Sequence, residues 1–105
     1  MNKDQIQHCH DILVRLDERG FHIGQGPLTP ELVRAVITAG NDLVNEAVLG
    51  PAGLPGLGVE DSEVMRTFRI VSRREAPPDP LMRVQVIMVA LDQAIAEALN
   101  APAAD

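Results

Sequence analysis

The residue types that most often do chemistry stand together near the start of the chain, where residues 8–11 read His-Cys-His-Asp. Imidazole, thiolate and carboxylate groups ligate metals, and a Cys–His pair can act as nucleophile and base. Residues two apart on a helix point about 200° away from one another, so His8 and His10 would face opposite sides. Cys9 falls on an apolar stripe, where it behaves as a small hydrophobic residue. We therefore expect a structural role, with no metal, no cofactor and no catalytic residue.

A second polar group, on the segment that follows, holds two carboxylates. Asp42 and Glu46 are four residues apart, so a helix would place both on one face, where they could bind a cation or act as acid and base. The chain contains no Glu-x-x-His pattern of a di-iron bundle. We expect a solvated surface. The alternative is a pocket between helices, in a small-ligand-binding protein or small enzyme, lined by Gly40, Asp42, Glu46 and His22.

Gly40 interrupts the apolar stripe of the same segment. A glycine inside a helix costs about 1 kcal/mol relative to alanine, so its presence calls for a reason. The residue before it, Ala39, is also small. We expect Gly40 to let another helix approach closely, and a ligand pressed against its backbone is the alternative.

The most distinctive charge feature is a group of four arginines, Arg66, Arg69, Arg73 and Arg74. Residues 64–74 carry a charge of +4 and no acid, which leaves −10 on the rest of the chain. The first three arginines are spaced by three and four, so a helix would present them on one face, and Arg83 could extend the patch. Such a face can bind a phosphate, a carboxylate ligand or an acidic partner. The alternatives are a solvated face and one paired with carboxylates of this chain.

A loop rich in glycine and proline occupies residues 50–59. It lacks the Lys and Ser/Thr of a phosphate-binding loop. Its apolar residues, Leu54, Leu57 and Val59, either cap one end of the bundle or form an interaction loop for a partner.

Glycine and proline clusters divide the chain into four segments, at about 2–19, 29–49, 60–75 and 79–100. Apolar residues recur every three or four positions in the first, second and fourth segments, which predicts helices. Helix-start signals precede these three segments: Asn2 with Gln5, Thr29 with Pro30, and Asp79 with Pro80.

Two stretches are ambiguous. Residues 64–74 and 81–91 are rich in β-branched residues and could be strands joined by the Pro-rich segment 76–80. That alternative is an α+β fold with two N-terminal helices, a β-hairpin at about 65–90 and a C-terminal helix. The 3-4 repeat from Leu81 to Ala98 favours a helix, because a strand does not need that period. We predict an all-α, small four-helix bundle-like domain spanning 1–105, with a frayed tail at 101–105.

Length and composition exclude several classes. The chain has 105 residues, a net charge of −6, one Cys, two Phe, and no Trp or Tyr. One cysteine excludes an intramolecular disulfide framework, and the missing aromatics remove the platforms on which single-stranded nucleic acids stack. Acidity makes nucleic acid an unlikely partner, and no apolar run approaches the roughly 18 residues of a membrane span. With no signal-peptide pattern at the start, a cytoplasmic protein of bacterial type is expected.

The composition of the fourth segment, residues 79–100, indicates whether the chain forms a dimer. Arg83 and Gln85 are the only polar residues between Leu81 and Leu91, and a helix that is apolar nearly all round must be buried on more than one side. We expect a homodimer, because a short chain gains stability by burying surface against a copy of itself. The alternative is a monomer in which this helix is central. The expected self-interface comprises Leu81, Val84, Val86, Met88 and Val89.

Taken together, these features predict a small acidic, non-catalytic protein–protein interaction module of adaptor, regulatory, inhibitor or immunity type. A homodimer and a further protein partner are both expected. One alternative is a small-ligand-binding protein or small enzyme with a pocket between helices. The remaining alternative is a DNA-binding regulator that uses residues 64–74.

Overall fold

The computed structural model describes residues 2–24, 26–50 and 61–100. Four helices follow in order: α1 (Lys3–Glu18), α2 (Pro30–Leu49), α3 (Asp61–Val71) and α4 (Pro80–Asn100). No described residue lies in a strand. The all-helical prediction is confirmed, and the β-hairpin alternative at 65–90 is wrong. Across the described ranges, no helix combines the length and apolar character that crossing a membrane requires.

The face of α3 that packs on the core explains why its β-branched residues are helical. Val64, Thr67 and Val71 recur at helical spacing, and each is at most 1% exposed. The hydroxyl of Thr67 donates to the carbonyl of Glu63 at 2.8 Å, so this buried group is satisfied within the helix. Burial of one face against the other helices therefore outweighs the strand preference of these residues.

Side-chain caps fix where three of the helices begin. Asn2 and Gln5 form a capping box, in which each side chain accepts the backbone N–H of the other residue at 3.0 and 2.9 Å. Thr29 accepts a hydrogen bond from the first turn of α2, and Asp79 accepts one from the first turn of α4. These caps satisfy backbone donors that a helix start leaves unpaired.

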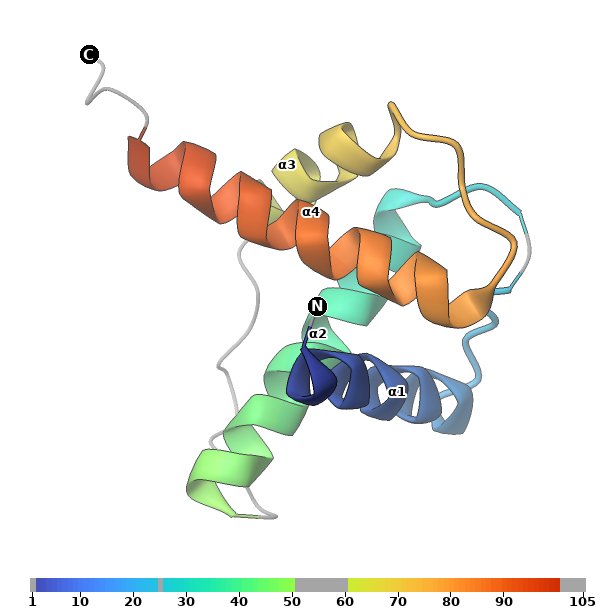
Figure 1. Cartoon of the computed structure of the whole chain (residues 1–105), viewed down its shortest axis with the longest axis vertical. Coiled ribbons are helices and arrows are strands. Elements are labelled where there is room, and N and C mark those ends of the chain that lie inside the picture. Colours follow the sequence, from blue (N-terminus) through green and yellow to red (C-terminus); the bar gives the residue numbers. More distant parts are fainter. Residues whose placement is uncertain (1, 25, 51–60, 101–105) are drawn as a thin grey trace.

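Helix α4, like α2, packs against every other helix of the bundle. It contacts α1, α2 and α3, whereas α1 and α3 lie on opposite sides of it and do not touch (Figure 1). Most of the buried side chains are aliphatic, and they include Ile12, Leu16, Val36, Ile37 and Ile87 at 1% exposure or less. Three intrachain neighbours thus account for a helix that is apolar nearly all round.

Gly40 marks the close approach of α2 to α1. A Cβ atom added at this glycine would lie 3.2 Å from Cδ1 of Ile12 and 3.5 Å from Nε2 of His8. The first distance is shorter than ordinary van der Waals contact. The missing side chain therefore lets α1 and α2 pack closely, which is the role expected for this glycine from the sequence.

Arg83 joins two loops from inside the protein. The residue is 6% exposed. Its guanidinium donates to the carbonyls of Ile23 and Gly26, in the α1–α2 loop, and to that of Pro77, in the α3–α4 loop. A buried charge needs such partners. Arg83 therefore holds the two loops together and does not extend the arginine surface of α3.

Candidate functional site

The four arginines of α3 and its C-terminal end gather around one groove. The groove has a volume of about 390 Å³ and lies between α3 and the C-terminal half of α4. Its polar lining consists of Arg66, Arg69, Arg73, Arg74, Gln93 and Glu97. All four arginines are exposed. We call this site the arginine groove.

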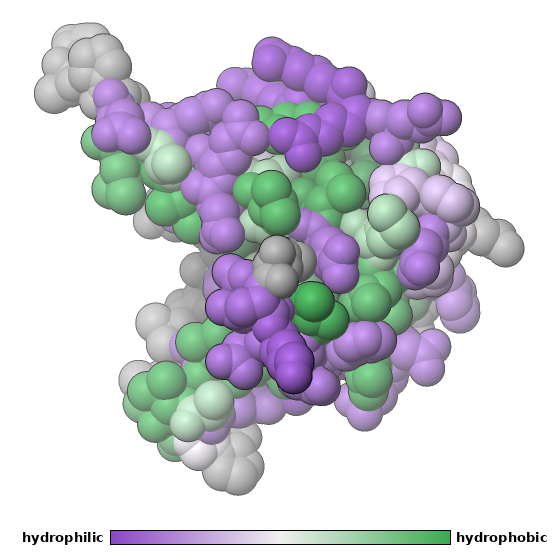
Figure 2. Space-filling model, viewed as in Figure 1, coloured by the Kyte–Doolittle hydropathy of each residue, from purple (hydrophilic) through white to green (hydrophobic). Residues whose placement is uncertain are grey.

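The spacing of two arginines on α3 and the turn after this helix together produce this convergence. Val64, Thr67 and Val71 turn one face to the core, so Arg66 and Arg69 lie on the outer side of the same helix. Helix α3 ends at Val71, and Arg73 and Arg74 lie in the turn that follows it. In Figure 2, hydrophilic side chains gather along the edge of the molecule formed by α3 and the loop that follows it. The helix predicted from the sequence therefore carries Arg66 and Arg69, but the prediction that Arg73 lies on the same helix face is wrong, because α3 ends at Val71.

The charges in the arginine groove are poorly compensated. No arginine of the groove forms an ion pair with another residue in the described part of the chain. Arg74 makes one long hydrogen bond, at 3.4 Å, to Oε1 of Gln93, and Gln93 donates to Glu97 at 3.3 Å. Like charges three or four apart on a helix repel by a few tenths of a kcal/mol. A bound anion would relieve this repulsion.

The guanidinium groups define what the groove can bind. Arginine presents a planar set of donors that matches carboxylate and phosphate oxygens, often through two parallel hydrogen bonds. No protein-family model matches the chain, and no similar curated protein or solved structure was found. The chemistry of the chain itself is therefore the basis for inferring its function.

Two residues of the groove were missed by sequence reasoning. Gln93 and Glu97 lie on α4, about one helical turn apart, and face the arginines across the groove. Their four-residue spacing places them on one face of a helix. Nothing in the sequence tells which face of α4 lies beside α3, so no sequence signal could assign them to this site.

Residues 8–11 do not form a chemical centre. His8 lies against α2 near Gly40, whereas His10 is exposed and Cys9 is 1% exposed. Burial raises the pKa of the Cys9 thiol, which disfavours the reactive thiolate. Within the described ranges, no three His, Cys, Asp or Glu side chains lie close enough together to hold a metal ion.

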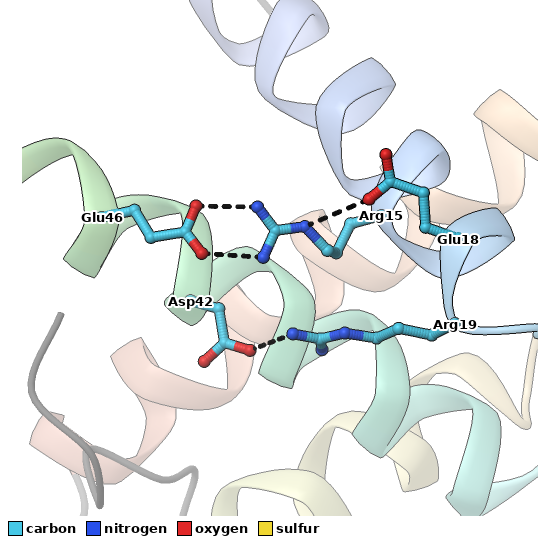
Figure 3. A network of polar contacts seen from close by, with 5 residues as sticks. All are labelled: Arg15, Glu18, Arg19, Asp42 and Glu46. Atoms are coloured by element: carbon cyan, nitrogen blue, oxygen red, sulfur yellow. Dashed lines mark hydrogen bonds and ion pairs between the residues drawn. The ribbon is translucent and has the colours of Figure 1, made fainter. Parts of the chain in front are cut away.

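The four residues of the alternative pocket between helices are not brought together. Gly40 is packed against α1, and His22 lines a different groove beside the end of α1. Glu46 is paired with Arg15 of α1, and Asp42 is paired with Arg19, the residue directly after α1 (Figure 3). Of the four main grooves over the described residues, none is lined by more than one member of this set.

The carboxylates of α2 instead join α2 to α1. Arg15 donates two hydrogen bonds to Glu46, at 2.8 and 2.7 Å, and Arg19 donates one to Asp42 (Figure 3). Paired N–H donors on a carboxylate give a strong and well-oriented contact. The hydrogen bonds from Arg15 hold the pKa of Glu46 below its ordinary value. The two arginines and two carboxylates therefore hold the end of α1 against α2. The spacing of these residues in the sequence does not reveal the contacts between them.

The expected self-interface of α4 divides between the core and the surface. Val84 is fully buried within the chain, and Leu81, Val86 and Met88 are partly buried against its core. Val89 is 43% exposed. Val84 faces neighbouring helices of its own chain, because α4 is central, and is not available to a second copy.

The expected interaction loop lies outside the described residues. Leu54, Leu57 and Val59 fall in the segment between α2 and α3 that the structure does not describe. The prediction for these three residues is untested.

Proposed function

We propose that the protein is a small non-catalytic protein–protein interaction module that binds an acidic segment of a partner through the arginine groove. One observation carries the proposal: four exposed arginines converge on one groove, and none is ion-paired within the described residues. The module would act as an adaptor, regulatory subunit or inhibitor.

Two features favour a protein segment over other anions. The groove, at about 390 Å³, has the size of a small binding pocket, which suits a few carboxylate side chains. Glu97 and the surplus of acidic residues elsewhere repel a long polyanion such as DNA. A short acidic segment can use the arginines without lying across the rest of the surface.

Fluorescence polarisation with a labelled oligoglutamate peptide tests the proposal. We expect saturable binding that weakens as salt is raised, because the contacts are electrostatic. Arg66→Glu, Arg69→Glu and Arg73→Glu together should abolish it, and circular dichroism should show an unchanged helix content since all three side chains are exposed. Binding that survives in the triple variant would contradict the proposal.

A labelled DNA duplex serves as the competing arm of the same experiment. The proposal predicts binding of the peptide and no binding of the duplex at moderate salt. Tighter binding of the duplex than of the peptide, with a steep salt dependence that the triple variant flattens, would assign residues 64–74 to DNA instead.

The homodimer and the cytoplasmic location belong to the same proposal. Val89 and Met82, which are 43% and 50% exposed, lie on the outer face of α4 and would supply apolar contact to a second copy. Cys9, as a free thiol, suits a reducing compartment. Light scattering coupled to size exclusion gives the mass directly, and twice 11.3 kDa is the expected value. A mass of 11.3 kDa at high concentration would contradict the dimer.

A further inference from the structure

A second groove, which shares no lining residue with the arginine groove, lies at the C-terminal end of α1. It has a volume of about 810 Å³ and runs between the last two turns of α1, the loop after α1 and the first residue of α4. Figure 1 shows this loop rising from the end of α1 toward the start of α4. The residues that matter here are Val14, Asp17, Glu18, Phe21 and Pro80. We call this site the acidic groove.

Apolar side chains in the acidic groove are exposed to solvent. Phe21 is 43% exposed and Val14 is 58% exposed. Phe21 is one of only two aromatic residues in the chain. Both line one concave site, so a partner side chain seated there would remove them from water together.

The wall that carries Phe21 is held in place before any ligand arrives. The backbone N–H of Phe21 donates to the carbonyl of Leu16 at 2.9 Å, and Gly20 adopts φ 81°, so α1 ends in a Schellman motif. Two residues later, the carbonyl of Ile23 is bound by the buried guanidinium of Arg83. A preformed wall lowers the entropy that binding must overcome.

The charge at the rim is negative and only partly compensated. Asp17 forms no ion pair within the described residues, and the one contact of Glu18 is to Nε of Arg15 at 3.8 Å. Arg15 also donates to Glu46 of α2, and Arg19 donates to Asp42 of α2. The two acids also stand at the C-terminal end of α1, where backbone carbonyls add partial negative charge. No lysine or arginine lines the groove.

From this geometry we propose that the acidic groove binds a basic amphipathic segment of a partner protein. An apolar side chain of that segment would pack on Phe21 and Val14, and an adjacent lysine or arginine would meet Asp17 and Glu18. The charge complementarity selects this occupant over an acidic or neutral peptide. The protein would then hold two partner surfaces of opposite charge.

A labelled peptide of Leu-Lys-Lys-Leu repeats tests the proposal, with Leu-Gln-Gln-Leu repeats as its neutral counterpart. We expect the basic peptide to bind about tenfold more tightly than the neutral one at low salt. Asp17→Asn with Glu18→Gln should remove most of that difference. The control pair Glu31→Gln with Glu75→Gln changes the net charge equally at sites outside the groove, and should weaken binding less than about twofold.

Amide chemical shifts on the unmodified protein give a second, independent readout. Shifts confined to the end of α1 and residues 21–24 are expected on adding the basic peptide. Equal weakening by the control pair, or shifts spread over the other helices, would overturn the proposal. A mass of twice the monomer that returns to 11.3 kDa in the Asp17→Asn, Glu18→Gln protein would assign the groove to a second copy, and would also overturn it.

Discussion

The guanidinium of Arg83 donates a hydrogen bond to the carbonyl oxygen of Ile23 at 3.0 Å, although the two residues are 60 positions apart in the chain. Two further carbonyls, those of Gly26 and Pro77, accept from the same side chain at 2.8 and 2.7 Å. One buried cation therefore fixes the relative position of the two loops that precede α2 and α4, including the wall of the acidic groove.

Arg83→Met should lower the free energy of unfolding by about 3 kcal/mol, because it leaves three loop carbonyls without their charged donor. Arg83→Lys should lower it by less, since one ammonium reaches fewer of these acceptors. Urea unfolding followed by far-ultraviolet circular dichroism measures both values. Arg69→Met is the matched control, because Arg69 is exposed, and it should change stability by less than about 0.5 kcal/mol. An equal cost at both arginines would contradict the role given to Arg83.

Gly40 and Ile12 should be energetically coupled. Gly40→Ala gains about 1 kcal/mol of helix propensity but brings a methyl group to 3.2 Å from Cδ1 of Ile12. Ile12→Val removes that atom and should cost about 1 kcal/mol alone. We expect the double variant to be more stable than the sum of the single effects by about 0.5–1 kcal/mol. Strict additivity would show that the two helices do not meet at this point.

Glu46 should make the protein sensitive to acid. Its pKa lies below the ordinary value when the protein is folded, because of the hydrogen bonds from Arg15. Its contribution to stability is therefore complete above the ordinary pKa of about 4.5 and is lost as the pH falls through the lowered folded value. Glu46→Gln should lower stability at neutral pH and flatten the decline between neutral and acidic pH.

Urea unfolding midpoints at several pH values measure the contribution of the contact between Arg15 and Glu46. Glu75→Gln is the comparison variant, because Glu75 is exposed and forms no ion pair in the described part of the chain. The account requires the acid dependence of the Glu75 variant to match that of the unmodified protein. Identical pH profiles for the two variants would show that the contact between Arg15 and Glu46 does not contribute.

Local signals were sufficient to predict the helices. Asn2 with Gln5 and Thr29 with Pro30 act within one helical turn, so their effect can be read from neighbouring residues. The segment around Thr67 is ambiguous in the sequence, because its conformation depends on contacts with distant residues. Its alternation resembles a strand, and packing of Val64, Thr67 and Val71 on the other helices decides between the two forms.

The residues of the sites could be predicted only in part from the sequence, because contacts between helices bring them together. The spacing of Arg66, Arg69 and Arg73 predicts one helix face, but α3 ends before Arg73, and Gln93 joins the arginines only because α4 lies beside α3. The spacing of Asp42 is typical of a site residue, but in the structure its carboxylate accepts a hydrogen bond from Arg19, 23 positions earlier. Arg83 carried a visible signal, a single charge inside an apolar run, which a buried structural role explains better than an exposed patch.

The measurement that tests the central claim most directly compares two single charge reversals. Arg69→Glu and Lys3→Glu change the net charge equally, but only the first lies in the arginine groove. In a polarisation titration with labelled oligoglutamate, we predict that Arg69→Glu weakens binding about tenfold and that Lys3→Glu weakens it less than about twofold. Equal losses would mean that the peptide responds to total charge alone, and would contradict a docking site on α3 and α4.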